Sequence, residues 1–397
     1  MSKLEELIKE FCPNGVEYKK LTDIASVLYG YPCDAALFNE SGKGRPLARI
    51  RDVLAGRTNT YSTENVPEKY ILTKGDLLVG MDGNFHTAIW QVDNAIICQR
   101  VCKIYSKDEN ILLNGFLFHL LRPLMRQIEN NKQSGTVKHL LDKDIKAIVI
   151  PLPALPVQRE IVRILDSFTL YSAELTAELT ARRKQYEFYR DKLLDFGNAK
   201  LVVKNKKLKE LCISIKDGMH NLPVTTDENT GYPVLSAMNI YDGQIHYDAK
   251  RFVSREVFEQ ESKRTKIETG DVLLTIVATI GRTAVVENST SFLLQRSVCA
   301  LKPSKEILSK YLKYYLDTNA IQNYIFANAH GSAQAGLYLN QVADIEVVLP
   351  PIEVQERIVK VLDNFDAICS DLGIGLPAEI EKRQKQYEYY RDKLLSF

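Results

Sequence analysis

The side chains that could do chemistry are scattered along this chain of 397 residues and do not form a known catalytic motif. There is no glycine-rich phosphate loop, no H-E-x-x-H zinc motif and no G-x-S-x-G nucleophile elbow. The six histidines are dispersed, so a shared metal site is not expected. Asp144-Ile145-Lys146 fits the D-x-K of nucleases, but we interpret this segment as a strand before a proline step and expect no nuclease site.

The cysteines and the lack of a signal-peptide core or membrane-spanning run predict an intracellular protein without a disulfide framework. The seven cysteines are odd in number, and only Cys98 and Cys102 lie close together, so we expect reduced, mostly buried thiols and no zinc site. There is no signal-peptide core and no apolar run of the ~20 residues that span a bilayer, which predicts a cytoplasmic location. A net charge of +2 neither supports nor excludes nucleic-acid binding, because a local basic face is enough.

Two segments of the chain occur twice, and this is its strongest signal. Residues 185–196, QYEFYRDKLLDF, recur at 386–397 as QYEYYRDKLLSF. Residues 157–168, VQREIVRILDSF, recur at 354–365 as VQERIVKVLDNF, and each copy follows a proline-rich step. Matches of this length do not arise by chance, so the chain is a tandem repeat.

The blocks before these helices match more weakly and look rich in strands. Lys74-Gly75-Asp76 parallels Thr269-Gly270-Asp271, and Gln99-Arg100 parallels Gln295-Arg296. Short apolar runs alternate with Gly, Asn and Asp turn signals, and one helical stretch follows in each block. Each block is therefore predicted to be a compact α+β domain. The strand runs and helical stretches that we expect are at residues 71–72, 77–79, 95–97, 272–277, 112–128 and 307–327.

The matched segments are predicted to be long helices. No proline or glycine interrupts residues 157–196, which gives a rod about 60 Å long at ~1.5 Å per residue. Apolar residues recur in alternating steps of three and four, and the second copy resumes this pattern after a break at residues 373–377. The seam residues are Leu165, Phe168, Leu175, Leu179, Tyr186, Tyr189, Leu193, Ile380, Tyr387, Tyr390 and Leu394.

An amphipathic rod of this kind must bury its apolar stripe against a partner. We expect the two copies to pack on each other as a coiled coil; the alternative is that each helix packs only on its own domain. The predicted organisation is an N-terminal recognition domain, a central spacer helix, a second recognition domain and a C-terminal spacer helix, over residues 1–153, 154–200, 201–352 and 353–397.

At these residues the sequence resembles the specificity subunits of type I restriction-modification enzymes. The resemblance covers essentially the whole chain. It is carried by the proline step with Val157–Val162 and its second copy, by the paired QYE-aromatic-YRDKLL ends and by the two Gly-Asp turns. The tandem tetrapeptide AELT at residues 173–176 and 177–180 is a further mark, because some members carry such repeats in the spacer helix.

The resemblance implies a division of labour among subunits. Each variable domain would read one half of a split target in double-stranded DNA. The helices would pair antiparallel and dock two methyltransferase (modification) subunits, which bring S-adenosylmethionine and methylate adenine N6. Restriction subunits, when bound, would bring ATP-driven translocation and cleavage. The chain itself would be non-catalytic, with no cofactor of its own.

Residues shared by both copies cannot encode two different half-sites, so we expect base reading where the copies diverge inside a shared frame. Arg100 and Arg296, in the matched Gln-Arg pairs, are predicted to be framework or backbone contacts. The divergent segments are the loop after the Gly-Asp strand, the segment before the last strand and a short stretch early in each domain. Their candidate DNA-binding residues are Arg49, Arg51, Asn84, His86, Ser134, Lys138, His139, Ser236, Asn239, Thr279, Arg282, Ser332 and Gln334.

For each of these side chains a solvated loop position is an equally good interpretation. Lys204, Lys206, Lys207 and Lys209 are interpreted as a solvated link between domains. For the whole chain, the alternatives are a stand-alone DNA-binding or regulatory protein with no methyltransferase partner, and a coiled-coil scaffold with no nucleic-acid role.

Overall fold

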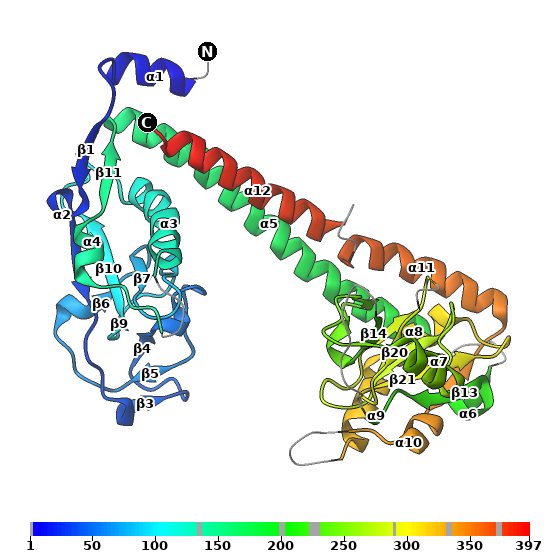
Figure 1. The fold of residues 1–397 in the computed structure, drawn as a ribbon. Coiled ribbons are helices and arrows are strands. Elements are labelled where there is room, and N and C mark those ends of the chain that lie inside the picture. Colours follow the sequence, from blue (N-terminus) through cyan, green and yellow to red (C-terminus); the bar gives the residue numbers. More distant parts are fainter. Residues whose placement is uncertain are drawn as a thin grey trace. The chain divides into compact units, whose positions relative to one another are not determined.

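The computed structural model of the protein divides into two compact units (Figure 1). Unit 1 contains residues 1–174 and 381–397, and unit 2 contains residues 175–380. The C-terminal segment therefore belongs with the N-terminal part of the chain. The structure describes residues 3–132, 137–197, 203–221, 231–288, 291–330, 336–370 and 375–397.

Unit 1 is built on two small sheets and one strand pair. The first sheet is antiparallel, and its strands in spatial order are β2 (Ala25–Tyr29), β10 (Val101–Ser106), β7 (Leu77–Gly80) and β8 (Thr87–Ile89). The second sheet contains β3 (Phe38–Asn39), β5 (Tyr61–Ser62), β4 (Arg45–Ala48), β9 (Ala95–Ile97) and β6 (Ile71–Leu72). The strand pair consists of β1 (Glu17–Lys20) and β11 (Val149–Leu152).

Unit 2 repeats this plan. Its antiparallel sheet runs in the order β13 (Cys212–Asp217), β21 (Val298–Pro303), β18 (Val272–Thr275) and β19 (Thr283–Val285). A second sheet contains β17 (Phe252–Val253), β14 (Tyr232–Leu235) and β20 (Leu293–Leu294). The strand pairs are β12 (Lys204–Lys207) with β22 (Glu346–Leu349), and β15 (Ile240–Tyr241) with β16 (Gln244–Ile245).

The helices flank these sheets, and short 3₁₀ turns join the strands. Unit 1 has α1 (Lys3–Phe11), α2 (Leu21–Ile24), α3 (Asn114–Asn130), α4 (Asp142–Lys146), η1 (Ala35–Leu37), η2 (Ile50–Asp52) and η3 (Glu68–Tyr70). Unit 2 has α6 (Leu208–Leu211), α7 (Arg255–Arg264), α8 (Ser309–Leu316), α9 (Asn319–Asn328), α10 (Leu339–Ala343), α11 (Ile352–Ser370) and η4 (Ala237–Asn239). Two further helices contribute to both units: α5 (Leu155–Leu194) and α12 (Leu376–Leu395).

The two units share pairing register as well as element order. In unit 1 the parallel pair β4–β9 places Leu47 opposite Ile96, and in unit 2 the pair β14–β20 places Val234 opposite Leu293. The central strands β7 and β18 are buried along their whole length and mostly apolar, as expected for strands covered on both faces. The turn before each has its glycine at a positive φ, +101° and +92°, which a side chain rarely tolerates.

Most expected elements are confirmed, and the exceptions are local. The strand runs correspond to β6, β7, β9 and β18, and the first helical stretch corresponds to α3. The second stretch is two helices, α8 and α9, because the chain turns at Asp317 and Thr318. The segment with Asp144 is the short helix α4 and not a strand, because Asp144 accepts the Leu141 N–H at 2.8 Å and so closes a helical turn.

The lysine-rich segment after α5 is also different from the expectation of a solvated link. Lys204 to Lys207 form strand β12, which pairs antiparallel with β22. Lys207 and Lys209 both reach Asp344, at 3.1 and 2.8 Å. Lysines in a paired edge strand keep its outer edge hydrophilic, which discourages further strand addition.

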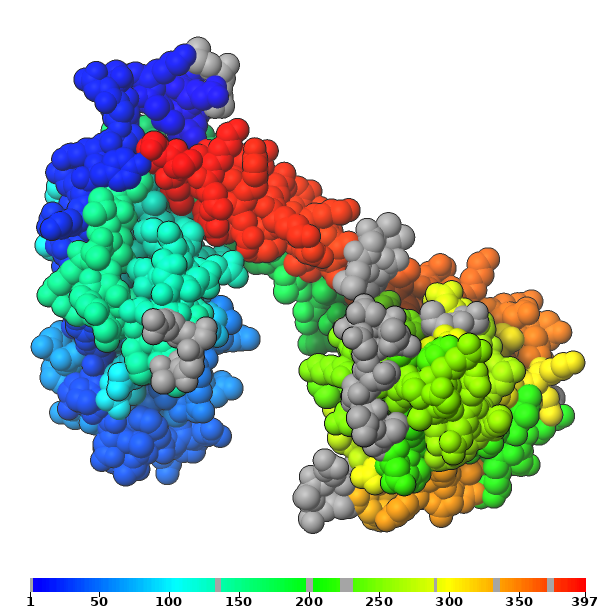
Figure 2. Space-filling model, in the orientation of Figure 1, coloured from blue at the N-terminus to red at the C-terminus, as the bar shows by residue number. Residues whose placement is uncertain are grey.

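Each unit closes its core with the end of a helix from the other half of the sequence. In unit 1, Tyr387 of α12 is 4% exposed within the cluster that contains β7, α3 and the start of α5. In unit 2, Leu194 of α5 is buried in the cluster that contains β18, α8 and the start of α11. Figure 2 shows the C-terminal residues, in red, against the N-terminal segment of unit 1, where the Tyr18 hydroxyl donates to the Phe397 carbonyl at 2.8 Å.

Helix pairing inside each unit confirms antiparallel contacts between the repeated helices. In unit 1, Phe168 of α5 stacks on Tyr390 of α12 with ring centroids 5.4 Å apart, and Arg383 of α12 lies 5.0 Å from the ring centre of Tyr171 of α5. The later residue of α5 thus contacts the earlier residue of α12, so the two helices run antiparallel. In unit 2, Tyr189 stacks on Phe365 of α11 at 5.8 Å. These two ring pairs join equivalent positions of the repeat, with the copies exchanged.

The seam residues differ in how far their side chains are exposed to solvent within each unit. Leu165 is fully buried and Leu175 is 8% exposed, whereas Tyr189 is 39% exposed. The seam residues that are partly buried are Leu179, Tyr186, Leu193, Ile380 and Leu394.

Among the described residues, none of the helices has the length and apolar character that a membrane span requires.

Candidate nucleic-acid interface

The sequence-predicted residues of unit 1 gather at one edge of its first sheet. Because β7 and β10 are antiparallel neighbours, the end of β7 meets the turn before β10, and the Met81 N–H donates to the Arg100 carbonyl at 2.8 Å. The segment before α4 joins them through Leu140 N–H to the Met81 carbonyl at 2.7 Å. We call this region, made of residues 49–52, 81–86, 98–100 and 138–140, edge 1.

Gly80 explains why the early segment 49–52 belongs to edge 1. A side chain on Gly80 would lie 3.3 Å from both the Asn84 carbonyl oxygen and the Ile50 side chain, so glycine lets these two segments approach closely. Arg51 is exposed. Arg49 is partly buried, and its guanidinium is used internally, with Nε 3.1 Å from Asp52 and a short contact from Nη2 to Thr60.

The loop of edge 1 between β7 and β8 faces a cavity as well as the edge. Asn84 and His86 line a space of about 390 Å³ together with Arg122 and Arg126 of α3 and with α12 residues that include Arg391. Phe85 between them is buried, and its N–H donates to Glu129 at 3.0 Å. The two polar side chains are thus held on a loop that is anchored at its centre.

Unit 2 has the same frame with different side chains, and we call residues 236–239, 276–282, 295–297 and 336–338 edge 2. Ile276 N–H donates to the Ser297 carbonyl at 2.9 Å, and Leu337 N–H donates to the Ile276 carbonyl at 2.8 Å, as Met81 and Leu140 do in unit 1. The Ala237 N–H donates to the Ser297 hydroxyl at 3.0 Å. The backbone frame is therefore shared down to individual hydrogen bonds.

This frame corrects the sequence match of Gln99-Arg100 with Gln295-Arg296. Gln99 N–H donates to the Tyr31 carbonyl at 2.7 Å, and the equivalent bond in unit 2, to Met219 at 2.9 Å, comes from Arg296. Arg296 thus takes the place of Gln99, and Arg100 takes the place of Ser297. The sequence match is therefore out of register by one residue with respect to the structure. Arg100 and Arg296 are not equivalent positions, so neither is a framework residue shared by the two units.

The other candidates of edge 2 have different surroundings. Asn239 is 8% exposed, accepts the Ser236 N–H at 3.0 Å and donates to the His246 carbonyl at 3.1 Å, so its amide organises the loop. Thr279, Arg282 and Arg296 are exposed. Thr279 follows Ala278, whose φ of +68° is rare for a residue other than glycine. Ser134, Ser332 and Gln334 lie outside the described residues.

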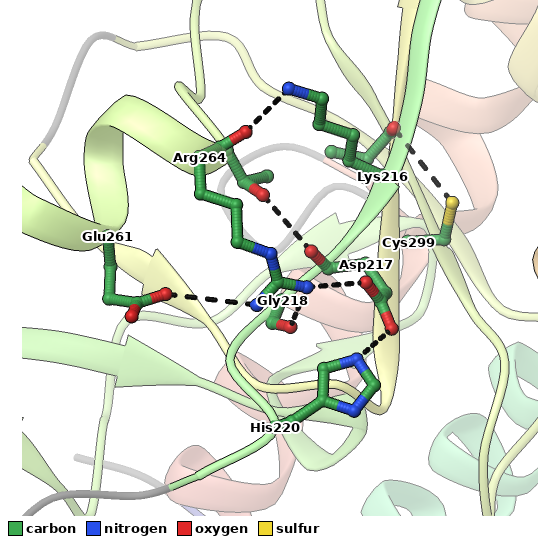
Figure 3. Close-up of polar contacts among 9 residues, drawn as sticks. Lys216, Asp217, Gly218, His220, Glu261, Arg264 and Cys299 are labelled. Carbon is green, nitrogen blue, oxygen red and sulfur yellow. Dashed lines mark hydrogen bonds and ion pairs between the residues drawn. The ribbon is translucent and has the colours of Figure 1, made fainter.

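Two acidic residues are not among the sequence-predicted candidates: Asp82, which lies in edge 1, and Asp217, which lies next to edge 2. Asp82 at the end of β7 lies between His139 and Arg100, at 2.6 and 3.3 Å. Asp217 at the end of β13 lies between His220 and Arg264, at 2.6 and 2.8 Å (Figure 3). Asp217 and His220 are three residues apart in the sequence, but Arg264 comes from the end of α7, so only folding brings the group together.

A pair of thiols lies beneath edge 1. Cys33 and Cys98 are 9% and 6% exposed in one small core cluster, and all seven cysteines are free. The Cys33 thiol, which donates to the Tyr31 carbonyl at 3.5 Å, lowers the pKa of the neighbouring Cys98 against the opposing effect of burial. In turn, Cys98, together with burial, raises the pKa of Cys33.

Neither a metal-ligand cluster nor a joint contact of the D-x-K residues is present in the part of the chain that the structure describes. No group of three or more His, Cys, Asp or Glu side chains could hold a metal ion there. The D-x-K residues do not act together, because Asp144 pairs with Lys132 while Lys146 pairs with Asp142 at 2.6 Å. Burial opposes the ion pair of Asp144, but the hydrogen bonds from Lys132 and the Leu141 N–H keep its pKa below the usual value.

Comparison with known proteins agrees with this doubled frame. The family model of the type I restriction modification DNA specificity domain matches residues 13–182 and, again, residues 202–382. The chain belongs to this family. It is a family of DNA-recognition domains and not of catalytic ones.

Individual members of the family align over most of the chain. The specificity subunit of the type I restriction enzyme EcoBI from Escherichia coli is 28% identical, over 89% of this chain and 79% of its own length. The EcoR124I/EcoR124II specificity subunit from E. coli is 31% identical, over 74% of this chain and 73% of its own. The S subunit of a type I restriction-modification system from M. genitalium superposes with a TM-score of 0.55 at 15% identity, covering 96% of both chains, which supports the fold.

Proposed function

We propose that this chain is the DNA specificity subunit of a type I restriction-modification enzyme, and that each unit reads one half of a bipartite target. One observation carries the proposal: the two edges share backbone hydrogen bonds but carry different side chains at equivalent places. His86 stands where Arg282 stands, Arg100 where Ser297 stands, and His139 where Gly336 stands. A common frame with altered polar groups is what two readers of different sequences need.

The exposed arginines of the edges suit contact with DNA. Arg51, Arg100, Arg282 and Arg296 are all exposed. A guanidinium donates two parallel hydrogen bonds to guanine O6 and N7 in the major groove, and it also binds phosphate. We expect the basic groups to position each unit on the duplex and a subset of them to read base edges.

The repeated helices support docking of two copies of one partner. Phe188 and Tyr189 form an edge-to-face pair at 5.4 Å and 75°, and their repeat equivalents Tyr389 and Tyr390 form the same pair at 5.3 Å and 76°. Phe188 is 61% exposed and Tyr389 is 62% exposed. Exposed aromatic pairs are favoured anchors of protein interfaces, and here the same anchor occurs twice.

The partners that fit are two methyltransferase (modification) subunits, with restriction subunits as additional components. S-adenosylmethionine would be bound by the methyltransferase subunits and ATP by the restriction subunits, and this chain would supply recognition and assembly.

The deciding experiment combines purification with sequencing of modified DNA. The tagged chain is expressed in its host, the proteins that co-purify with it are identified, and adenine methylation is mapped across the host genome. We expect co-purification of the methyltransferase and methylation at one motif of two short blocks separated by unread bases. Sequence-specific DNA binding without any methyltransferase would instead support the stand-alone regulator. Absence of salt-dependent DNA binding would leave only the scaffold.

Docking on the aromatic pairs can be tested by counting subunits. Phe188→Ala and Tyr389→Ala should each reduce the number of bound methyltransferase subunits from two to one, and the double variant should bind none, as measured by native mass spectrometry. Leu170→Ala is the control, because Leu170 is equally exposed on α5, at 63%, outside the aromatic pairs. Retention of two methyltransferase subunits by the double variant would contradict this assignment.

A further inference from the structure

Each unit contains a carboxylate that holds one histidine and one arginine at the same time. In unit 1, one Asp82 oxygen contacts His139 Nδ1 at 2.6 Å and the other contacts Arg100 Nε at 3.3 Å. In unit 2, one Asp217 oxygen contacts His220 Nε2 at 2.6 Å and the other contacts Arg264 Nη2 at 2.8 Å. We call these two groups the Asp82 cluster and the Asp217 cluster.

The clusters occupy different places around the same structural turn. The turn before β10, and its equivalent before β21, lies between the ends of two strands. Asp82 follows β7, on one side of the turn, where Met81 N–H bonds to the turn. Asp217 ends β13, on the other side, where Gly218 N–H donates to the Val298 carbonyl at 3.2 Å. The two clusters therefore lie at positions that are not equivalent in the repeat, and Val277 stands in unit 2 where Asp82 stands in unit 1.

Stability does not explain these clusters. The carboxylates are partly buried, at 23% and 13% exposed, but Arg100 and His220 are 61% and 57% exposed. Ion pairs at such positions contribute roughly 0–1 kcal/mol. Arg100 also has a φ of +70°, a conformation that costs free energy for a residue with a side chain and that is concentrated at functional sites.

Each cluster leaves polar groups facing outward; in unit 1 these are the Arg100 guanidinium and the half-exposed ring of His139. Arg100 uses Nε for Asp82, so the two terminal nitrogens of its guanidinium remain for a ligand. In unit 2, Arg264 is occupied: besides Asp217 it donates to the Gly218 carbonyl at 3.1 Å and lies 3.8 Å from Glu261, and its own carbonyl accepts Lys216 Nζ at 2.7 Å. His220 is the outward group there, with its second ring nitrogen pointing away from Asp217 (Figure 3).

We propose that Arg100 and His220 are the specificity-determining contacts of unit 1 and unit 2 with DNA base edges, and that Asp82 and Asp217 are their positioning residues. This inference rests on the proposed function. A carboxylate that fixes a long or rotatable side chain before binding reduces the entropy lost in the complex, and it limits the directions in which that side chain can donate. It therefore favours discrimination among bases over general attraction to DNA.

A positioning carboxylate has a signature that a merely structural one lacks. Removing any surface carboxylate reduces repulsion of phosphates and raises affinity for all DNA. Removing a positioning carboxylate also releases the side chain that it holds, so discrimination between bases falls while affinity for unrelated DNA rises. The matched control is Asp344→Ala, because Asp344 also holds two cations, Lys207 and Lys209, on the surface of unit 2.

The experiment uses the full-length chain in complex with its methyltransferase and a pool of random-sequence DNA duplexes. Bound duplexes are recovered and sequenced, so the preference at each position of both half-sites is measured. Asp82→Ala and Arg100→Ala should each lower the preference at one position of one half-site roughly tenfold and leave the other half-site unchanged. Asp217→Ala and His220→Ala should do the same in the other half-site, and Asp344→Ala should alter neither.

The outcomes separate the two levels of the argument. If wild-type complex selects no sequence, the proposed function is wrong. If wild-type selects a bipartite motif and the exposed-residue variants Arg100→Ala and His220→Ala keep it intact, the assignment of readers is wrong. If those two variants lose a base preference but both aspartate variants keep it, the positioning role is wrong.

Discussion

At the scale of single residues, the two units share a buried glutamine at equivalent positions. Gln158 accepts the Leu113 N–H at 2.9 Å and donates to the carbonyls of Ile111 and Pro153. Gln355 makes the equivalent three bonds in unit 2, to Leu308, Glu306 and Pro350. Both side chains are fully buried, so each one satisfies three backbone groups that water cannot reach.

We expect Gln158→Ala to lower the free energy of unfolding by roughly 3 kcal/mol, because three backbone groups lose partners worth about 1 kcal/mol each. Gln355→Ala should do the same in unit 2. Urea denaturation measures both. Gln91→Ala is the control, since Gln91 is exposed and bonds only to the nearby Ile89 carbonyl. Equal stability of the Gln158 and Gln91 variants would show that the buried amide is dispensable.

The two units differ in the polar residue at the centre of the core. In unit 1, His119 is fully buried between the Tyr387 hydroxyl, at 3.0 Å, and Asp166, at 2.9 Å. In unit 2 the equivalent residue is Tyr314, which donates to Asp363 at 2.6 Å. Burial lowers the pKa of His119, helped by Arg122 and Arg391 and opposed by Asp166.

This pKa direction predicts how stability depends on pH. Because the folded state holds His119 with a lowered pKa, the unfolded state binds its proton first. The contribution is therefore fully present above pH ~6.5 and is lost as pH falls below that value, with a slope of at most ~1.4 kcal/mol per pH unit. His119→Tyr, the residue that unit 2 uses, should remove this part of the dependence in urea titrations between pH 5 and 8. A variant that parallels wild-type throughout would contradict the assignment.

At the scale of elements, α5 carries the tandem tetrapeptide in its middle. Residues 173–180 lie within one continuous helix of 40 residues, and Ala173 and Glu174 are exposed. A change in the number of these repeats alters helix length and rotation without touching either edge. The element is thus suited to set the distance between half-sites.

Deletion of residues 173–176 shortens α5 by ~6 Å and rotates the C-terminal part of the helix by roughly 40° relative to its N-terminal part. With DNA rising ~3.4 Å per base pair, we expect the unread gap to change by one or two base pairs while both half-sites stay the same. Methylation mapping of a strain with the deletion measures this. Replacement of Glu174 and Thr176 by alanine, which keeps the length, should change nothing. A changed half-site would argue against the ruler.

At the scale of the whole molecule, each unit contains the end of a helix from the other half of the sequence. The last helix of the chain, α12, contributes its C-terminal part to the core of unit 1. Tyr387 and its equivalent Tyr186 belong to the cores of unit 1 and unit 2, respectively. Each unit therefore depends on residues from the far half of the sequence. Loss of either helix end should weaken the unit that receives it and not the unit that is next to it in sequence.

Tyr387→Ala should destabilise unit 1 by roughly 3 kcal/mol, because a buried aromatic ring leaves a cavity in the core. Hydrogen exchange should then accelerate in β7 and β10 and stay slow in β18 and β21. Tyr186→Ala should give the reverse pattern, weakened to the extent that Tyr186 is only partly buried. Acceleration in both sheets by either variant would mean that the units unfold together.

The sequence alone predicted the two-part chain, the α+β class, the helices and their pairing. These features follow from repetition and hydrophobic periodicity, which can be recognised directly in the amino-acid sequence. It also located the loops that form the edges. It misjudged α4, β12 and the match of Gln99-Arg100 with Gln295-Arg296. Strand β12 forms because the distant strand β22 supplies its backbone hydrogen bonds, whereas α4 begins with a side-chain cap from Asp144. The one-residue register of the Gln-Arg pairs is set by pairing within the sheet and not by sequence identity.

Only the tertiary structure decided which polar side chains act together. Asn239 lies in a divergent loop, but its side-chain amide forms hydrogen bonds within that loop. Asp82 and Asp217 each contact an arginine from another part of the chain, which only the fold brings near. The exchange of helix ends between cores was equally hidden, since both copies carry the same apolar stripe and would fit either unit. Contacts of long sequence separation follow from the three-dimensional path of the chain, and no local pattern encodes that path.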